Sequence, residues 1–139
     1  MNPAQQRPEP LIFFIDECLG QGVGEALKKA GAEVRFYGVD IPRGTPDAVW
    51  LATIGEKKWI CLTKDKAIRR RPQERKALEE AGVKAFVLTS GNLPGAEMAA
   101  LFANNLRRME KMARNIPGPF IATVTRTGIV ALPPGIPGR

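Results

Sequence analysis

Acidic side chains stand at three separated points of the sequence where they could do chemistry together. Asp16 and Glu17 directly follow an apolar run, Asp47 opens a helical pattern, and Asp65 follows a second apolar run. Carboxylates that are brought together repel one another unless protons or a cation compensate their charge. Oxygen ligands favour hard cations, so we expect Mg²⁺ or Mn²⁺ if these acids meet.

The elements that would position these acids follow from the hydrophobic pattern. Short apolar runs predict strands, and periodic segments closed by glycine predict helices. The strands are expected at residues 11–15, 32–37, 59–63, 84–88, 120–125 and 128–132. The helices are expected at residues 20–30, 47–54, 72–81 and 95–115. The second helix has the strongest start signal, because Thr45-Pro46 supplies a cap and a proline at its beginning.

Strands that alternate with helices define βαβ units. They predict an α/β fold, a three-layer α/β/α sandwich with a mainly parallel central sheet of four to five strands. Ligands of such folds bind outside the carboxyl ends of the strands. The residues expected at that edge are Asp16, Glu17, Asp47, Asp65, Ser90 and Asn92.

The acids also have purely structural interpretations. The helix macrodipole alone favours Asp47 in a first turn, and Asp65 could simply pair with Lys64 or Lys66. Asp16 is the strongest candidate, because an acid directly after a buried strand is costly without a partner.

The glycines at 20, 22 and 24 raise a different possibility, a dinucleotide-binding loop. The fingerprint of that loop is G-x-G-x-x-G, but here the third glycine comes one residue early and Glu25 stands in its place. Asp16 and Glu17 would also lie beside a bound pyrophosphate and repel it. Nucleotide binding therefore stays an alternative behind the cation site.

The chain of 139 residues has the size of one domain, with 44% hydrophobic and 25% charged residues. We expect a flexible lead-in at residues 1–10, a single domain at 11–132 and a disordered tail at 133–139. No apolar run could cross a bilayer and no signal-peptide pattern is found, which predicts a cytoplasmic protein. The absence of histidine excludes Ser-His-Asp and Cys-His catalysis, and Cys18 and Cys61 are expected to be buried free thiols.

The net charge of +7 is unevenly distributed. Residues 1–56 contain eight acids and five bases, whereas residues 57–84 contain ten bases and four acids. This arrangement suits binding of a polyanion near an acidic pocket, although an ordinary solvated surface explains the same charges. The bases expected to hold nucleic acid next to the site are Lys64, Lys66, Arg69, Arg70 and Arg71. Those expected to extend this track are Arg107, Lys111, Arg114 and Arg126.

Three segments together resemble the PIN-like domains, in particular VapC-like ribonucleases and the Mut7-C and DUF5615 groups. The segments are FFIDECLGQGVGEALKKAG, GTPDAVWLATIGEKKWICLTKD and VKAFVLTSGNL, and the resemblance covers roughly residues 11–125. It implies that Asp16, Asp47 and Asp65 bind the metal, with Glu17 as a further acid and Thr63 as a supporting hydroxyl. Many members carry another acid after the fourth strand, where this chain has Ser90 and Asn92. Either Ser90 or Asn92 could hold a metal-bound water instead, or a second metal could be weakly bound.

The resemblance implies a Mg²⁺- or Mn²⁺-dependent endoribonuclease and suggests the toxin of a type II toxin-antitoxin pair. The expected partners are an RNA substrate, a cognate antitoxin protein and, in a homodimer, a second copy of the chain, with no membrane. A free-standing RNA-processing nuclease is the nearer alternative. A nucleic-acid-binding or scaffold module of the same fold, without cleavage, is the alternative from another class.

Overall fold

The computed structural model describes residues 10–64, 71–89, 93–127 and 130–131. The lead-in expected at 1–10 lies outside the described residues except for Pro10, and so does the tail expected at 133–139. The single domain expected at 11–132 stays a prediction. None of the helices in the described part of the chain combines the length and apolar character that a membrane crossing requires.

The centre of the molecule is a six-stranded sheet in the order β2-β1-β3-β4-β5-β6. Its strands are β1 (Ile12–Ile15), β2 (Glu33–Phe36), β3 (Ile60–Thr63), β4 (Lys84–Leu88), β5 (Phe120–Val124) and β6 (Val130–Ala131). The first five are parallel, and the two-residue β6 is antiparallel to β5. The predicted fold class is therefore confirmed, with a short sixth strand at the edge.

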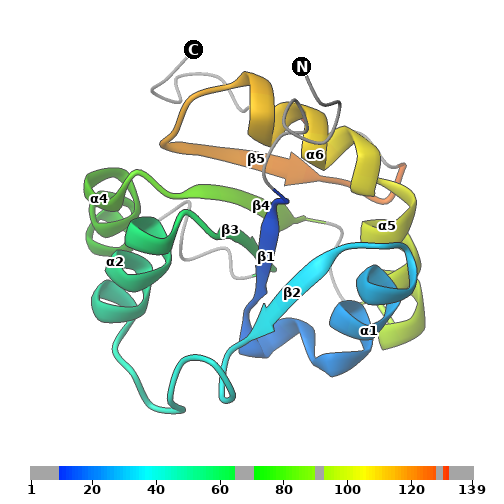
Figure 1. Ribbon diagram of the computed structural model, residues 1–139, viewed down its shortest axis with the longest axis horizontal. Coiled ribbons are helices and arrows are strands. Elements are labelled where there is room, and N and C mark those ends of the chain that lie inside the picture. Colours follow the sequence, from blue (N-terminus) through cyan, green and yellow to red (C-terminus); the bar gives the residue numbers. More distant parts are fainter. Residues whose placement is uncertain (1–9, 65–70, 90–92, 128–129, 132–139) are drawn as a thin grey trace, which may run out of the picture.

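Helices cover both faces of this sheet (Figure 1). They are the 3-10 helix η2 (Glu17–Leu19) and the α-helices α1 (Gln21–Lys29), α2 (Asp47–Lys57), α4 (Pro72–Ala81), α5 (Gly95–Asn104) and α6 (Leu106–Asn115). Helix α1 packs against α5, and α2 packs against α4. Figure 1 shows these two pairs on opposite sides of the strands, which gives the three layers.

The core explains why the central strands are continuous apolar runs. All four residues of β3 are buried, and so are Phe13 and Phe14 on adjacent positions of β1. Adjacent residues of a strand point to opposite faces, so both faces of β1 must be covered by helices. Phe86 of β4 packs edge-on against Phe120 of β5, with ring centroids 5.5 Å apart.

The prediction of one helix at residues 95–115 is wrong in one respect: the structure has two helices there, α5 and α6, which meet at Asn105. The side chain of Asn105 is 5% exposed and donates to the carbonyl oxygen of Leu101 at 2.8 Å. Its backbone leaves the helical region, with φ −104° and ψ 8°. Asparagine competes with the helix for backbone hydrogen bonds, which accounts for the break.

Helix α2 also extends beyond the predicted end near Gly55. It ends at Lys57, and Lys58 takes the left-handed conformation with φ 61°. Gly55 is a packing position instead: a Cβ there would lie 2.4 Å from the carbonyl oxygen of Ala81 in α4. Glycine therefore lets α2 and α4 approach each other closely.

Gly24 has a comparable role between α1 and the sheet. A Cβ at this position would lie 2.3 Å from the ring of Phe36, the last residue of β2. The ring therefore occupies the space that a side chain at Gly24 would need. This contact gives the third glycine of the sequence motif a packing role that needs no bound phosphate.

Candidate functional site

The carboxyl ends of β1 and β3 and the start of α2 surround a cavity of about 400 Å³. Its lining residues are Asp16, Glu17, Cys18, Tyr37, Asp47, Trp50 and Lys64. Three of the four acids expected at this edge thus line one cavity. The fourth, Asp65, lies outside the described residues, as do Ser90 and Asn92.

Asp16 is held firmly at the end of β1. Its backbone N–H donates to the carbonyl oxygen of Leu62 at 3.1 Å, which continues the pairing of β1 with β3. Its Oδ1 accepts from the N–H of Glu17 at 2.7 Å, and its Oδ2 accepts from the hydroxyl of Thr63 at 2.8 Å. Thr63 is fully buried, so its hydroxyl orients the carboxylate from below the cavity floor.

Cys18 belongs to the same cluster. Its Sγ lies 3.5 Å from Oδ2 of Asp16 and 3.4 Å from the hydroxyl of Thr63, and it accepts from the N–H of Lys64 at 3.5 Å. The sequence predicted two buried free thiols; both are free, Cys61 is buried, and Cys18 is half-buried beside the acids. Burial and the negative charge of Asp16 raise the pKa of the Cys18 thiol above its usual range.

The raised pKa gives a testable expectation for thiol chemistry in protein freed of metal with EDTA. We expect the rate of iodoacetamide modification of Cys18 to rise with pH with a midpoint above that of an unperturbed thiol. The thiolate is the reactive form, so a raised pKa delays its appearance. Mass spectrometry of samples quenched between pH 7 and pH 10 gives the rates.

The Asp16→Asn variant serves as the control for this profile. Removing the carboxylate charge should move the midpoint to lower pH without opening the cavity. A wild-type midpoint at or below that of the thiol in the urea-unfolded chain, or an unchanged midpoint in the variant, would contradict the electrostatic explanation. The same shift makes stability depend on pH. Between the thiol pKa of the unfolded chain and the higher pKa of the folded chain, only the unfolded chain has lost the Cys18 proton, so the free energy of unfolding falls as pH rises.

Asp47 is the first residue of α2, and aromatic residues fix its position. The indole N–H of Trp50 donates to Oδ1 of Asp47 at 2.9 Å. The Trp50 ring packs against Phe14, with centroids 5.5 Å apart, and edge-on against Tyr37 at 6.4 Å. Sequence reasoning missed Tyr37 and Trp50; the three-residue spacing from Asp47 to Trp50 on one helix face was the available signal.

Glu17 points to the rim of the cavity and forms an ion pair with Arg43 from the segment between β2 and α2. Arg43 was not among the predicted site residues. Lys64 was predicted, and it lines the cavity directly after β3. The cavity therefore combines three carboxylates with one lining ammonium group and an arginine at its edge.

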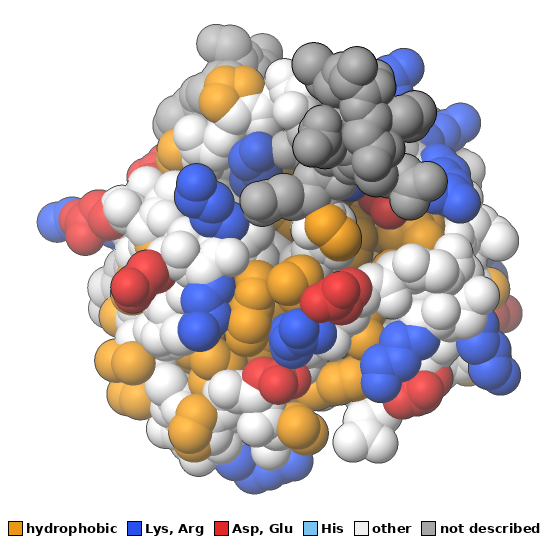
Figure 2. Space-filling view, in the orientation of Figure 1, with side chains coloured by type: hydrophobic (Ala, Val, Ile, Leu, Met, Phe, Trp, Pro, Cys, Tyr) orange, Lys and Arg blue, Asp and Glu red, His pale blue; other side chains and the backbone are white. Residues whose placement is uncertain are grey.

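The structure distributes the other predicted basic residues over several places. Lys66, Arg69 and Arg70 lie outside the described residues, and the exposed Arg71 is 3.8 Å from Glu74 at the start of α4. Arg114 lines a separate cavity with Lys84 at the amino ends of the strands, opposite the acids. Figure 2 shows Lys and Arg side chains spread over one face of the molecule with acidic side chains between them.

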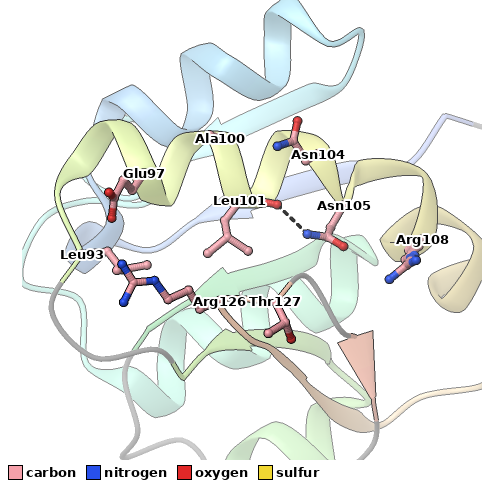
Figure 3. Close-up of a pocket in the computed structure, with 9 residues that line it drawn as sticks. All are labelled: Leu93, Glu97, Ala100, Leu101, Asn104, Asn105, Arg108, Arg126 and Thr127. Atoms are coloured by element: carbon pink, nitrogen blue, oxygen red, sulfur yellow. Dashed lines mark hydrogen bonds between the residues drawn. The ribbon is translucent and has the colours of Figure 1, made fainter.

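Arg126 lies in a second groove, of about 490 Å³, between α5 and the turn after β5 (Figure 3). Arg108 lines this groove as well, whereas the adjacent Arg107 pairs with Glu110 on α6 and does not. Figure 3 shows Arg126 extended along the groove toward Leu93 and Glu97. The structure therefore does not gather Arg107, Lys111, Arg114 and Arg126 into one described cavity, and their nucleic-acid contacts stay predictions.

The donor atoms of the acidic cavity suit a hard cation. Carboxylate oxygens from Asp16, Glu17 and Asp47 are oxygen ligands of the kind that Mg²⁺ and Mn²⁺ take, and the chain has no imidazole. Within the described ranges, no group of three or more acidic or cysteine side chains is close enough to hold a metal ion. The predicted third ligand, Asp65, lies outside those ranges.

A parallel α/β sandwich with acids at the carboxyl edge of its sheet is the architecture that the sequence predicted. The chain belongs to the PIN-like domain family: the family model described as "PIN like domain" matches residues 11–90, which include β1 to β4 and all the residues that line the acidic cavity. The predicted family is thereby confirmed.

A curated protein of Mycobacterium tuberculosis (strain ATCC 25618 / H37Rv), named "Putative ribonuclease VapC45", is 32% identical to this chain over 123 residues. The aligned region covers 85% of this chain and 88% of that protein. No solved structure gives a significant match.

Proposed function

We propose that this protein is a divalent-metal-dependent endoribonuclease that hydrolyses phosphodiester bonds of RNA. The observation that carries the proposal is the cavity at the carboxyl edge of the sheet, which Asp16, Glu17 and Asp47 line together. Membership of the PIN-like family and the similarity to a protein named as a ribonuclease support the same activity.

The carboxylates of Asp16 and Asp47 offer oxygen ligands of the kind that suits a Mg²⁺ or Mn²⁺ ion. Asp16, Asp47 and Asp65 would hold it, and Glu17 would stand beside them. When bound, the cation supplies a Lewis acid that offsets negative charge on the phosphate and lowers the pKa of a nearby water. Ser90 and Asn92 are proposed to hold a water molecule from the end of β4.

Hydrogen bonds from neighbouring residues orient the carboxylates of Asp16 and Asp47. Thr63 and the N–H of Glu17 each hold one oxygen of Asp16, and Trp50 holds one oxygen of Asp47. Both carboxylates thus keep an orientation that they would otherwise lose to solvent, which lowers the reorganisation needed during reaction. In the reaction, water would add to phosphorus and lose a proton to a carboxylate, while the bond from phosphorus to the leaving oxygen breaks and that oxygen takes up a proton from solvent.

Basic residues near the cavity would hold the polyanion that the acids repel. Lys64 lines the cavity, and Lys66, Arg69, Arg70 and Arg71 follow it in the sequence. Each phosphate contact also releases counterions from the nucleic acid, so binding should weaken as salt is added. Arg107, Lys111, Arg114 and Arg126 are proposed as more distant contacts.

We further propose that the protein is the toxin of a type II toxin-antitoxin pair and acts on RNA in the cytoplasm. This step rests on the resemblance to VapC-like ribonucleases. A cognate antitoxin would restrain the nuclease by covering the acidic cavity or the adjacent basic residues.

The deciding experiment is an RNA cleavage assay with purified protein. Single-stranded and structured RNA are incubated with Mn²⁺, with Mg²⁺, or with EDTA, and the products are separated on denaturing gels. We expect cleavage within the strand with either metal and none with EDTA. Binding of RNA without cleavage under all conditions would favour the nucleic-acid-binding module instead, and cleavage in EDTA would remove the metal from the mechanism.

A further inference from the structure

Arg43 reaches the acidic cavity from a different part of the chain than the acids do. It lies four residues before Asp47, in the segment that joins β2 to α2, and its Nη1 donates to Oε1 of Glu17. Glu17 is the neighbour of Asp16, so a cation is attached to the acidic cluster at its rim. The guanidinium also packs on Gly38, where a Cβ would lie 3.0 Å from Nη2.

The segment that carries Arg43 is tied to the cavity wall. The N–H of Gly44 donates to the hydroxyl of Tyr37 at 2.9 Å, and Tyr37 lines the cavity and packs on Trp50. Trp50 in turn holds Asp47. These contacts keep the base of the arginine at a fixed place beside the cavity, while its long side chain is free to change partner.

The ion pair itself is easy to exchange. The side chain of Arg43 is 70% exposed and that of Glu17 is 54% exposed, and pairs of this kind contribute little to stability because water screens them. A phosphate offers arginine two parallel charge-assisted hydrogen bonds, which are stronger than those of an exposed single contact. An RNA phosphate at the mouth of the cavity would therefore compete well for Arg43.

Moving Arg43 from Glu17 to a phosphate would also change the carboxylate of Glu17. With Glu17 bound to Arg43, part of its negative charge is offset, and it is a weaker ligand for a cation. Once Arg43 turns to a phosphate, Glu17 becomes available as an additional oxygen ligand beside Asp16 and Asp47. Substrate arrival and completion of the acidic ligand set would then be linked.

We propose that Arg43 is a substrate-positioning residue that exchanges Glu17 for a phosphate of the RNA strand and so releases Glu17 to the metal-binding acids. This inference rests on the proposed function and adds to it a residue, Arg43, and a role for the rim carboxylate. According to this proposal, breaking the Arg43–Glu17 ion pair links the two binding events, so that bound RNA raises the affinity for the metal and bound metal raises the affinity for RNA.

The test measures the two ligands separately by equilibrium binding. Affinity for a fluorescein-labelled single-stranded oligoribonucleotide is measured by anisotropy in EDTA, and affinity for Mn²⁺ without RNA is measured by the fluorescence of tryptophan, since Trp50 contacts Asp47. The variants are Arg43→Ala, Arg43→Lys and Glu17→Gln. The matched control is Lys76→Ala, which removes one positive charge from another exposed ion pair, with Glu80 on α4.

The two partners of the ion pair should give opposite results. We expect Arg43→Ala to weaken RNA binding about tenfold, the size of one charge-assisted contact, and to tighten Mn²⁺ binding, because Glu17 loses the partner that offsets its charge. Arg43→Lys should fall between Arg43→Ala and wild type in RNA affinity, because it keeps the charge and loses the forked geometry. Glu17→Gln should weaken Mn²⁺ binding and leave RNA binding equal or tighter, and Lys76→Ala should change both affinities less than twofold.

Other outcomes would overturn the inference. A purely structural ion pair would make Arg43→Ala and Glu17→Gln lower both affinities and the melting temperature together, and an unaffected RNA affinity in Arg43→Ala would remove its role. If the wild type cleaves RNA with Mn²⁺ but Arg43→Ala and Glu17→Gln do not have opposite effects on the RNA and Mn²⁺ affinities, only this inference fails. If the wild type neither binds nor cleaves RNA, the proposed function fails with it.

Discussion

Replacing Asp16 by Asn is expected to reduce the rate of metal-dependent RNA cleavage about 10³-fold, because a metal ligand and its charge are lost together. The fold should survive, since Asn can still accept a hydrogen bond from Thr63 or from the N–H of Glu17 at the same place. Single-turnover cleavage of a labelled RNA gives the rate, and circular dichroism during heating gives the melting temperature.

Asp40→Asn is the matched control for this change. The carboxylate of Asp40 accepts from the N–H of Phe36 at 2.8 Å and is not among the residues that line the cavity, and an asparagine oxygen can make the same bond. The control should cleave within twofold of the wild type. If Asp16→Asn retained full activity with an intact fold, the nuclease site would have to lie elsewhere.

The largest expected effect on stability comes from Gly55→Ala. Its new Cβ would meet the carbonyl oxygen of Ala81 at 2.4 Å and the Cβ of Ala81 at 2.8 Å, so α2 and α4 must move apart. Overpacking of this kind costs about 3 kcal/mol, against which alanine in a helix regains about 1 kcal/mol. Urea unfolding should therefore give a free energy of unfolding lower by about 2 kcal/mol.

Gly22→Ala makes the same chemical change where there is room. Among the described residues, no atom outside the adjoining backbone of α1 lies within 4 Å of a Cβ at Gly22, so helix propensity alone should act and raise the free energy of unfolding by about 0.5 kcal/mol. Opposite signs for the two substitutions would support the close approach of α2 and α4. A stabilised Gly55→Ala variant would contradict it.

Most of the fold could be predicted because its central strands are buried on both faces. Such strands are short apolar runs whatever their neighbours are, and the β4 and α4 boundaries agree with the prediction to the residue. The break at Asn105 could not be predicted from periodicity, because the apolar face continues from Phe102 through Leu106 to Met109 across it. At the break the backbone of Asn105 leaves the helical region, and its buried side chain donates to the carbonyl oxygen of Leu101.

The candidate site was predictable where its residues follow directly from strand ends. Asp16 and Lys64 come next after β1 and β3, and a parallel sheet brings those ends together. Tyr37 comes next after β2 and could have been placed at this edge by the same rule. Arg43 belongs to the irregular segment between β2 and α2, whose course depends on tertiary contacts, so its place beside the acids could not be derived from spacing. Asp65 lies outside the described ranges.

The contact between Gly24 and the ring of Phe36 has a consequence for how this protein can be redesigned. Gly24 leaves space beside the sheet and the ring of Phe36 fills it, so the substitutions tolerated at one position depend on the residue at the other. A substitution at position 24 alone therefore requires the ring of Phe36 to move before the new side chain fits. Varying both positions together allows smaller side chains at position 36, which leave room for a Cβ at position 24.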